Sequence, residues 1–188
     1  MGFKEILEYV RDETSPKLRF GKVLAGKSIL WMDCTREDKE SERAKLRKTM
    51  SATSKRVDKC RMKVVRNADE VLTELGRDNS KEYDLVIITC DGDNGGVVAF
   101  KVLQRINEIR YPSTDTDTSN SKSPMVIVHA DYEADVSEEM KGKVMRMGAF
   151  EYTTDIVSLA SVILRAFTIY DQGGDRKHMT PVPGKRTI

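Results

Sequence analysis

Short apolar runs recur along the chain, and each is interrupted by charged residues, glycine or polar loops. Five such runs occupy residues 28–32, 62–65, 85–88, 125–128 and 150–152. Their lengths are typical of β-strands rather than of buried helices. The third run, Leu-Val-Ile-Ile, is continuous and β-branched, as expected for a strand that is covered on both faces of a parallel sheet. The pattern therefore predicts five strands, with residues 85–88 at the centre.

Segments with helical spacing follow each of these runs. The charged stretch 36–56 predicts a solvated helix. Apolar residues then recur at intervals of three and four in 68–76, 99–110, 137–148 and 155–170, the second and fourth of these five segments ending in glycine. Strict alternation of strands and helices predicts an α/β fold with a parallel sheet, right-handed crossovers and helices on both faces.

The ends of the chain and one internal segment differ from this pattern. Residues 1–26 predict an extra N-terminal helix and a linker, and residues 27–171 form the predicted domain. Residues 112–124 are rich in Ser, Thr and Asp, so we expect a flexible loop there, either a tolerated insertion or a phosphorylated regulatory loop. Residues 172–188 combine glycine, proline and charge, which predicts a disordered tail.

The charge balance restricts the partners of the protein. The 188 residues include 32 Lys and Arg against 30 Asp and Glu, so the chain has no large field of one sign. Binding to nucleic acid or to an anionic membrane by charge alone is therefore not expected. No apolar run approaches the roughly 20 residues that a membrane helix needs.

The three cysteines suggest a reducing compartment. Cys34, Cys60 and Cys90 are an odd number without CxxC spacing, which favours thiols over a disulfide framework or a zinc site. We therefore expect a cytoplasmic protein. Cys34 and Cys90 each follow a predicted strand, and those strands are predicted neighbours, so a redox pair is one interpretation and two small buried side chains are the other.

Residues near the fourth and fifth strands carry a resemblance to a known family. Ala130 follows the fourth run, Gly148-Ala149-Phe150-Glu151-Tyr152 surrounds the fifth, and Gly96 opens the third crossover helix. With the order of elements, these residues make the stretch 27–170 similar to the receiver domain of two-component response regulators. The resemblance implies a doubly wound, flavodoxin-like sheet of strand order 2-1-3-4-5, with its crevice at the carboxyl ends of strands one and three.

The resemblance also identifies the positions of a phosphorylation pocket. A receiver has an acidic pair after strand one, an acceptor Asp ending strand three, a hydroxyl after strand four and a Lys after strand five. These positions hold Asp33 with Cys34, then Thr89 (or Ile88, counted back from Gly96), then His129 and Asp155. The chain therefore resembles a degenerate receiver, or pseudo-receiver.

The expected function follows from this resemblance. It is a non-catalytic, cytoplasmic signalling domain of the two-component type, without ordinary aspartyl phosphorylation and without a cofactor. Such a domain acts by binding a protein partner or parent signalling assembly, or by forming a homodimer.

Two alternatives give the acidic loop after the third strand a chemical role. Asp91 and Asp93 point to the same end of the sheet as Asp33, so the three carboxylates could hold Mg²⁺ for a receiver-like reaction. The same loop resembles the Asp-x-Asp strand of Toprim domains, which are Mg²⁺-dependent nucleic-acid enzymes, although Asp33 lacks the Glu-Gly of that family. The remaining interpretation is a solvated turn.

The last helix is apolar nearly all round. Besides a core stripe, Val162, Ala166 and Ile169 form a second apolar line. This line predicts either a homodimer or partner interface, or a face covered by another part of the same chain.

The two histidines suggest no catalytic or metal site. His129 ends the fourth predicted strand and is interpreted as a pocket residue with local hydrogen bonds, whereas His178 lies in the predicted tail. Two histidines so far apart along the chain do not predict a metal cluster.

Overall fold

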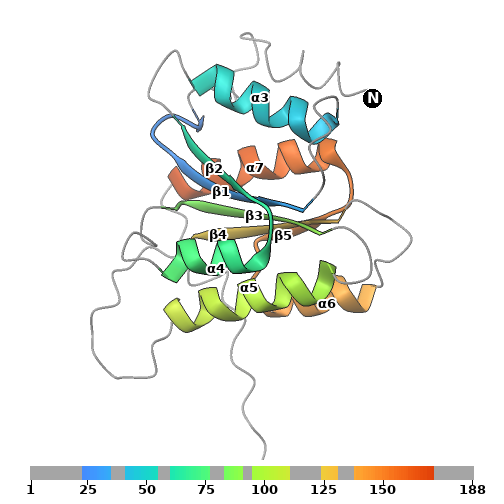
Figure 1. Ribbon diagram of the computed structural model, residues 1–188. Helices are drawn as coiled ribbons and strands as arrows, with labels where there is room; N and C mark the ends of the chain where they lie inside the picture. The colour runs from blue at the N-terminus through green and yellow to red at the C-terminus, as the bar shows by residue number, and fades with distance from the viewer. Residues whose placement is uncertain are drawn as a thin grey trace, which may run out of the picture.

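The protein folds as a single five-stranded parallel sheet with helices on both faces (Figure 1). The computed structural model describes residues 23–34, 41–54, 60–76, 83–90, 95–110, 124–130 and 138–171. Most of the predicted N-terminal segment 1–26, nearly all of the loop 112–124 and the whole tail 172–188 lie outside these residues. The elements are β1 (Ser28–Asp33), α3 (Glu42–Ser54), β2 (Arg61–Val65), α4 (Ala68–Gly76), β3 (Leu85–Cys90), α5 (Gly95–Arg110), β4 (Met125–Ala130), α6 (Glu138–Arg146), β5 (Glu151–Thr153) and α7 (Ile156–Asp171).

The strand order confirms the predicted fold class. The strands lie in the order β2-β1-β3-β4-β5, and every neighbouring pair is parallel. Figure 1 shows α3 and α7 on one face of the sheet and α4, α5 and α6 on the other. The chain reverses the direction in which it adds strands between β1 and β3, which is where folds of this class usually place their functional crevice.

Alternate residues of the central strands enter two separate cores. Ile29 and Trp31 of β1 pack with α3 and α7, whereas Leu30 and Met32 pack with the helices of the opposite face. All four side chains are fully buried. The continuous apolar runs of the sequence are explained by this arrangement, because both faces of a central strand are covered.

Helix α3 is not the solvated helix that its charge predicts. Leu46 and Met50 are buried in the core that α3 shares with α7 and one face of the sheet, and Ala44 is buried as well. Arg43, although charged, is also buried. The sequence prediction was wrong here because a few apolar residues on one face are enough to bury a helix whose other positions are charged.

Helix α7 lies on the same face of the sheet as α3 and contacts it, and most of its apolar residues are packed within the chain (Figure 1). Val162 is 8% exposed, Ala166 is fully buried and both belong to the same core cluster, while Ile169 is partly buried. The predicted interface is corrected for the first two residues, because intrachain packing already covers their side chains. Whether the chain forms a homodimer stays a prediction.

Glycine 148 turns the chain from α6 into β5, as predicted. Its backbone φ of 93° is in the left-handed region, where a side chain would be strained. The N–H of Gly148 donates to the carbonyl of Met145 at 3.0 Å, and the N–H of Ala149 donates to that of Val144 at 3.3 Å. These two bonds are the Schellman ending of a helix, and they fix where β5 begins.

The central strands extend beyond their apolar runs. β1, β3, β4 and β5 continue into Asp33, Cys90, Ala130 and Thr153, so polar residues lie inside the carboxyl ends of the strands. In the described part of the chain, every helix is too short or too polar to cross a membrane.

Candidate functional site

Four polar residues form a row across the carboxyl ends of four neighbouring strands. Asp33 of β1 is the register partner of Thr89 in β3, Thr89 is the partner of His129 in β4, and His129 is the partner of Thr153 in β5. Their exposures are 5%, 0%, 1% and 6%. The structure therefore brings the predicted pocket residues Asp33, Thr89 and His129 together and adds Thr153 to them.

The row faces the side of the sheet that α3 and α7 cover. Side chains alternate between faces along a strand, so Asp33 points to the same side as Trp31, which packs in the α3 and α7 core. Because a buried polar group without a partner costs free energy, each residue of such a row needs compensation by hydrogen bonds or charge.

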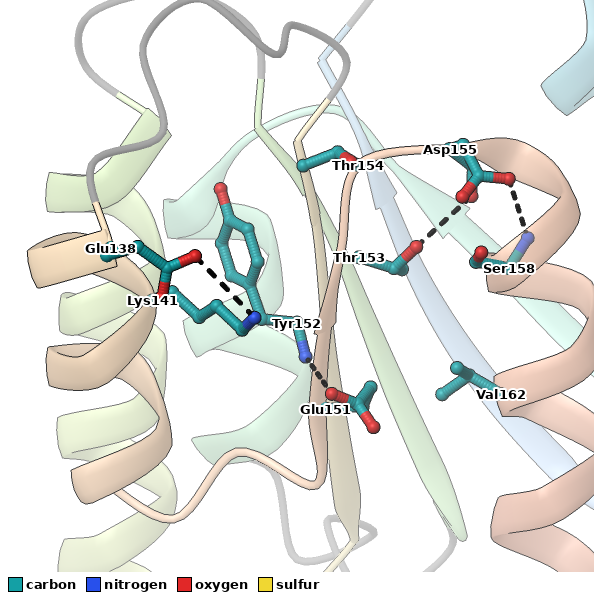
Figure 2. Close-up of a pocket in the computed structure, with 9 residues that line it drawn as sticks. All are labelled: Glu138, Lys141, Glu151, Tyr152, Thr153, Thr154, Asp155, Ser158 and Val162. Carbon is teal, nitrogen blue, oxygen red and sulfur yellow. Dashed lines mark hydrogen bonds and ion pairs between the residues drawn. The ribbon is translucent and has the colours of Figure 1, made fainter.

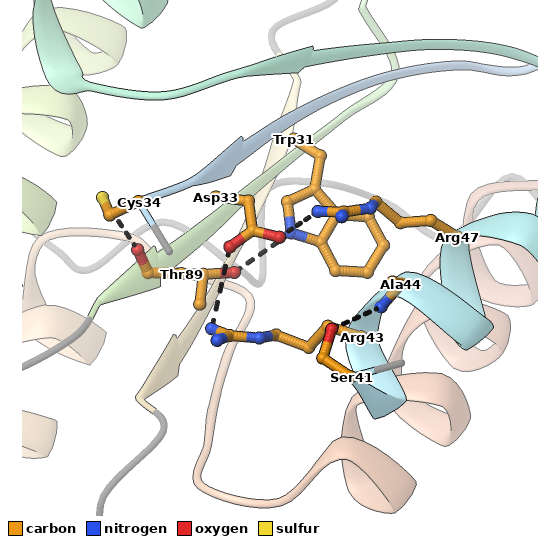
Figure 3. Close-up of polar contacts among 8 residues, drawn as sticks. All are labelled: Trp31, Asp33, Cys34, Ser41, Arg43, Ala44, Arg47 and Thr89. Carbon is orange, nitrogen blue, oxygen red and sulfur yellow. Dashed lines mark hydrogen bonds and ion pairs between the residues drawn. The ribbon is translucent and has the colours of Figure 1, made fainter. Parts of the chain in front are cut away.

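Two arginines of α3 compensate the carboxylate of Asp33 (Figure 3). The Nη1 of Arg47 donates a hydrogen bond to Oδ2 of Asp33, and Nη1 of Arg43 lies 3.8 Å from Oδ1. The arginine side chains are 18% and 7% exposed, so the ion pairs are shielded from water. Arg43 and Arg47 are one turn apart, which places both guanidinium groups on the same face of α3.

The ion pair continues into the rest of the row through Trp31. The guanidinium carbon of Arg47 lies 5.7 Å from the centroid of the Trp31 ring, a distance that permits a cation–π contact. The indole Nε1 of Trp31 donates a hydrogen bond of 3.0 Å to Oγ1 of Thr89. Thr89, which occupies the position of the acceptor Asp in a receiver, is thus buried and holds the indole in place.

Helix α3 begins with a local hydrogen bond that sets its position relative to Asp33. The backbone N–H of Ala44 donates to Oγ of Ser41 at 3.2 Å, so Ser41 caps the helix (Figure 3). This is the bond that an N-cap serine makes with the third residue of a helix. The cap fixes the first turn, from which Arg43 reaches the carboxylate.

Asp155 caps the last helix. Its Oδ1 accepts a hydrogen bond of 2.8 Å from the backbone N–H of Ser158, and Oγ1 of Thr153 donates to its carbonyl oxygen at 3.1 Å (Figure 2). Burial opposes ionisation of this carboxyl, but the hydrogen bonds from Ser158 and the backbone of Val157 outweigh burial and lower its pKa. The charge of His129 lowers it further. An acidic side chain at this position therefore has a structural role.

Cys34 follows the row at the end of β1. Its thiol is exposed, and Sγ donates to the carbonyl oxygen of Thr89 across a distance of 3.5 Å (Figure 3). Cys90, the last residue of β3, has Ala130 of β4 as its register partner. Cys34, which replaces one member of the acidic pair of a receiver, thus lies against the end of β3.

A pocket of about 430 Å³ lies beside β5, between α6 and α7. Its lining includes Glu138 and Lys141 of α6, Tyr152 of β5, Thr154 after β5, and Val162 of α7 (Figure 2). Among the described strands β5 pairs only with β4, so it is an edge strand of the sheet. Glu151, Thr153, Asp155 and Ser158 complete the lining.

The predicted metal site is only partly described. Asp91 and Asp93 lie outside the described residues, so the predicted magnesium site and the Toprim-like interpretation stay predictions. Among the residues that the structure describes, no group of three or more His, Cys, Asp or Glu could hold a metal ion. Asp33, the member that is described, contacts two arginines instead.

Sequence reasoning missed the partners of the row. Arg43, Arg47 and Trp31 were not among the candidate residues. One signal was present in the sequence: two arginines four residues apart follow a strand that ends in Asp33, which indicates that both can reach its carboxylate. Thr153 was missed for another reason. It lies one residue beyond the fifth apolar run, and the predicted strand stops at residue 152, whereas β5 includes residue 153.

Comparisons with known proteins identify similar folds and no family. The sequence matches no protein-family model and no curated protein. Among solved structures, the Mn²⁺-bound form of the response regulator Rcp1 is similar over 84% of this chain and 97% of its own, with 13% identity and a TM-score of 0.45. A fusion carrying the yeast Spc42 trimeric coiled coil is similar over 82% of this chain and 89% of its own, with 12% identity and a TM-score of 0.46.

Proposed function

We propose that this chain is a receiver-like, non-catalytic signalling domain that has no ordinary aspartyl phosphorylation and acts by binding another protein. The observation that carries the proposal is the engagement of Asp33 by Arg43 and Arg47. In a working receiver, the equivalent carboxylate holds Mg²⁺, and the metal neutralises the charge of the incoming phosphoryl group. Here guanidinium groups of the same chain supply the positive charge.

Two further positions support the proposal, because their side chains already have structural roles. Thr89 is fully buried and accepts the indole hydrogen bond of Trp31, so a phosphoryl donor has no access to its hydroxyl. Asp155 stands where the resemblance calls for a Lys, and it caps α7. A carboxylate there would repel a phosphoryl group instead of stabilising it.

The surface that we assign to partner binding is the polar pocket beside β5, which is the edge strand among the described strands. An extended segment of a second protein can bind beside an edge strand of this kind. Because Val162 and Ala166 are buried, this surface replaces the second apolar line of α7 in the proposal.

Incubation with acetyl phosphate and Mg²⁺ tests the loss of phosphorylation. We expect the intact mass of the protein to stay unchanged, because Asp33 is ion-paired and position 89 is not a carboxylate. A receiver domain with a complete acidic set, treated in the same tube, provides the positive control. An added phosphoryl group that is labile to hydroxylamine and maps to a peptide containing Asp33 or Asp91 would contradict the proposal.

A further inference from the structure

Cys34 and Cys90 lie at the ends of two neighbouring strands. The last register pair of β1 and β3 joins Asp33 to Thr89, so the next residues along the two strands are Cys34 and Cys90. Neighbouring strands are about 4.8 Å apart. Disulfides join residues whose Cα atoms are about 4.4–6.8 Å apart, and the usual spacing of neighbouring strands lies in that range.

The position of the Cys34 thiol brings it still closer to this partner. Sγ lies 3.5 Å from the carbonyl oxygen of Thr89, and that carbonyl belongs to the peptide bond that leads into Cys90. The oxygen of a trans peptide is about 2.8 Å from the following Cα by standard bond geometry. The Cys34 sulfur is therefore within about 6 Å of the backbone Cα of Cys90 by the same geometry.

Cys34 and Cys60 differ in how readily an oxidant can react with them. Cys34 is exposed, so an oxidant in solution can reach its sulfur. Cys60 differs, because it is half-buried and desolvation, aided by the nearby charge of Asp84, raises its pKa to about 11. Since the thiolate is the reactive form of cysteine, Cys60 is a poor competitor for oxidation.

We propose that Cys34 and Cys90 are a redox pair that closes to an intrachain disulfide when the protein meets a hydroperoxide. The thiolate of Cys34 attacks the peroxide oxygen and becomes a sulfenic acid, and the leaving oxygen departs as alcohol or water. The thiol of Cys90 then displaces water from that sulfur. Two thiols are oxidised to one disulfide, and the peroxide is reduced. In the cytoplasm such a bond is transient, as expected of a sensor.

Closure of this bond acts directly on the polar row. Cys34 is bonded to Asp33, and Cys90 is bonded to Thr89, so a disulfide fixes the separation of the two strand ends at the row itself. Trp31 reports the change, because it is the one tryptophan of the chain and donates to Thr89. The proposal is independent of the proposed signalling function, since it rests on the two cysteines alone.

Peptide mapping after peroxide treatment tests the pair. Trypsin releases Cys34 in residues 28–36, Cys90 in 82–101 and Cys60 in the dipeptide 60–61, so the three thiols are separated. We expect the full chain to lose two hydrogens, to stay monomeric on a non-reducing gel, and to give one linked peptide joining 28–36 to 82–101. Dithiothreitol should restore both peptides and the starting emission spectrum of Trp31.

Single serine variants separate this outcome from others. Cys34→Ser and Cys90→Ser should each abolish the linked peptide and the reversible change in Trp31 emission, whereas Cys60→Ser should leave both unchanged. The proposal is overturned if the linked peptide contains Cys60, if Cys34 forms only a disulfide between two chains, or if peroxide leaves both cysteines as thiols or takes Cys34 no further than sulfenic acid.

Discussion

Replacing Asp33 by alanine lowers the free energy of unfolding by about 3 to 5 kcal/mol, the usual cost of removing one partner of a buried ion pair. The side chains of Arg43 and Arg47 are 7% and 18% exposed, and both lose the carboxylate that compensates them. The loss arises from uncompensated buried charge, so it is far larger than the loss of one contact. Urea unfolding followed by far-ultraviolet circular dichroism measures it without relying on Trp31.

Two control variants make this result specific. Glu108 pairs with Arg105 on the surface of α5, with side chains that are 49% and 47% exposed. Its replacement by alanine should change the free energy of unfolding by less than about 1 kcal/mol, because exposed ion pairs contribute little. Removing the charges together, with Arg43→Met and Arg47→Met added to Asp33→Leu, should recover most of the loss. If Asp33→Ala costs no more than Glu108→Ala, the buried ion-pair network is wrong.

The second large effect is expected at Ala166. This residue of α7 is fully buried in the core shared with α3, so Ala166→Glu must place a charged carboxylate among apolar side chains. We expect a loss of about 4 kcal/mol or more, in the range of substitutions that bury an unpaired charge. Thermal unfolding by circular dichroism would show a large fall in Tm.

An exposed residue of the same helix, Ser161, supplies the control for the substitution at Ala166. Ser161 is exposed on the same helix, so Ser161→Glu should leave both the Tm and the oligomeric state unchanged. If Ala166→Glu keeps the wild-type Tm but converts a dimer to a monomer in light scattering, then Ala166 is a surface residue and the packing of α7 is wrong.

The fold could be predicted from the sequence because its signal is repeated. Alternating strand and helix patterns predict an α/β fold with a parallel sheet, and the resemblance to receiver domains implies the order 2-1-3-4-5 that the structure shows. The resemblance also identified Asp33, Thr89 and His129 as residues of one pocket, and the register of the parallel strands places them in one row.

The partners of these residues could not be predicted in the same way. A charged residue such as Arg43 is expected in solvent, and only the packing of α3 against the sheet shows that it is buried with Asp33. The sequence left two alternatives open for the second apolar line of α7 for a related reason. Apolar residues on a second face of a helix indicate a neighbour, but they do not say whether that neighbour belongs to the same chain. Here α3 is such a neighbour within the chain.

The most direct test of the central claim is a nuclear magnetic resonance titration of the uniformly ¹⁵N-labelled chain with Mg²⁺ and beryllofluoride, which together mimic a phosphorylated receiver. Arg43 and Arg47 already neutralise Asp33, and Thr89 already holds the indole of Trp31. We therefore predict that the amide signals of Asp33 and Thr89 and the indole signal of Trp31 do not move. Saturable shifts confined to these three signals would contradict the account, because they would show that the pocket still binds the metal and the phosphoryl mimic.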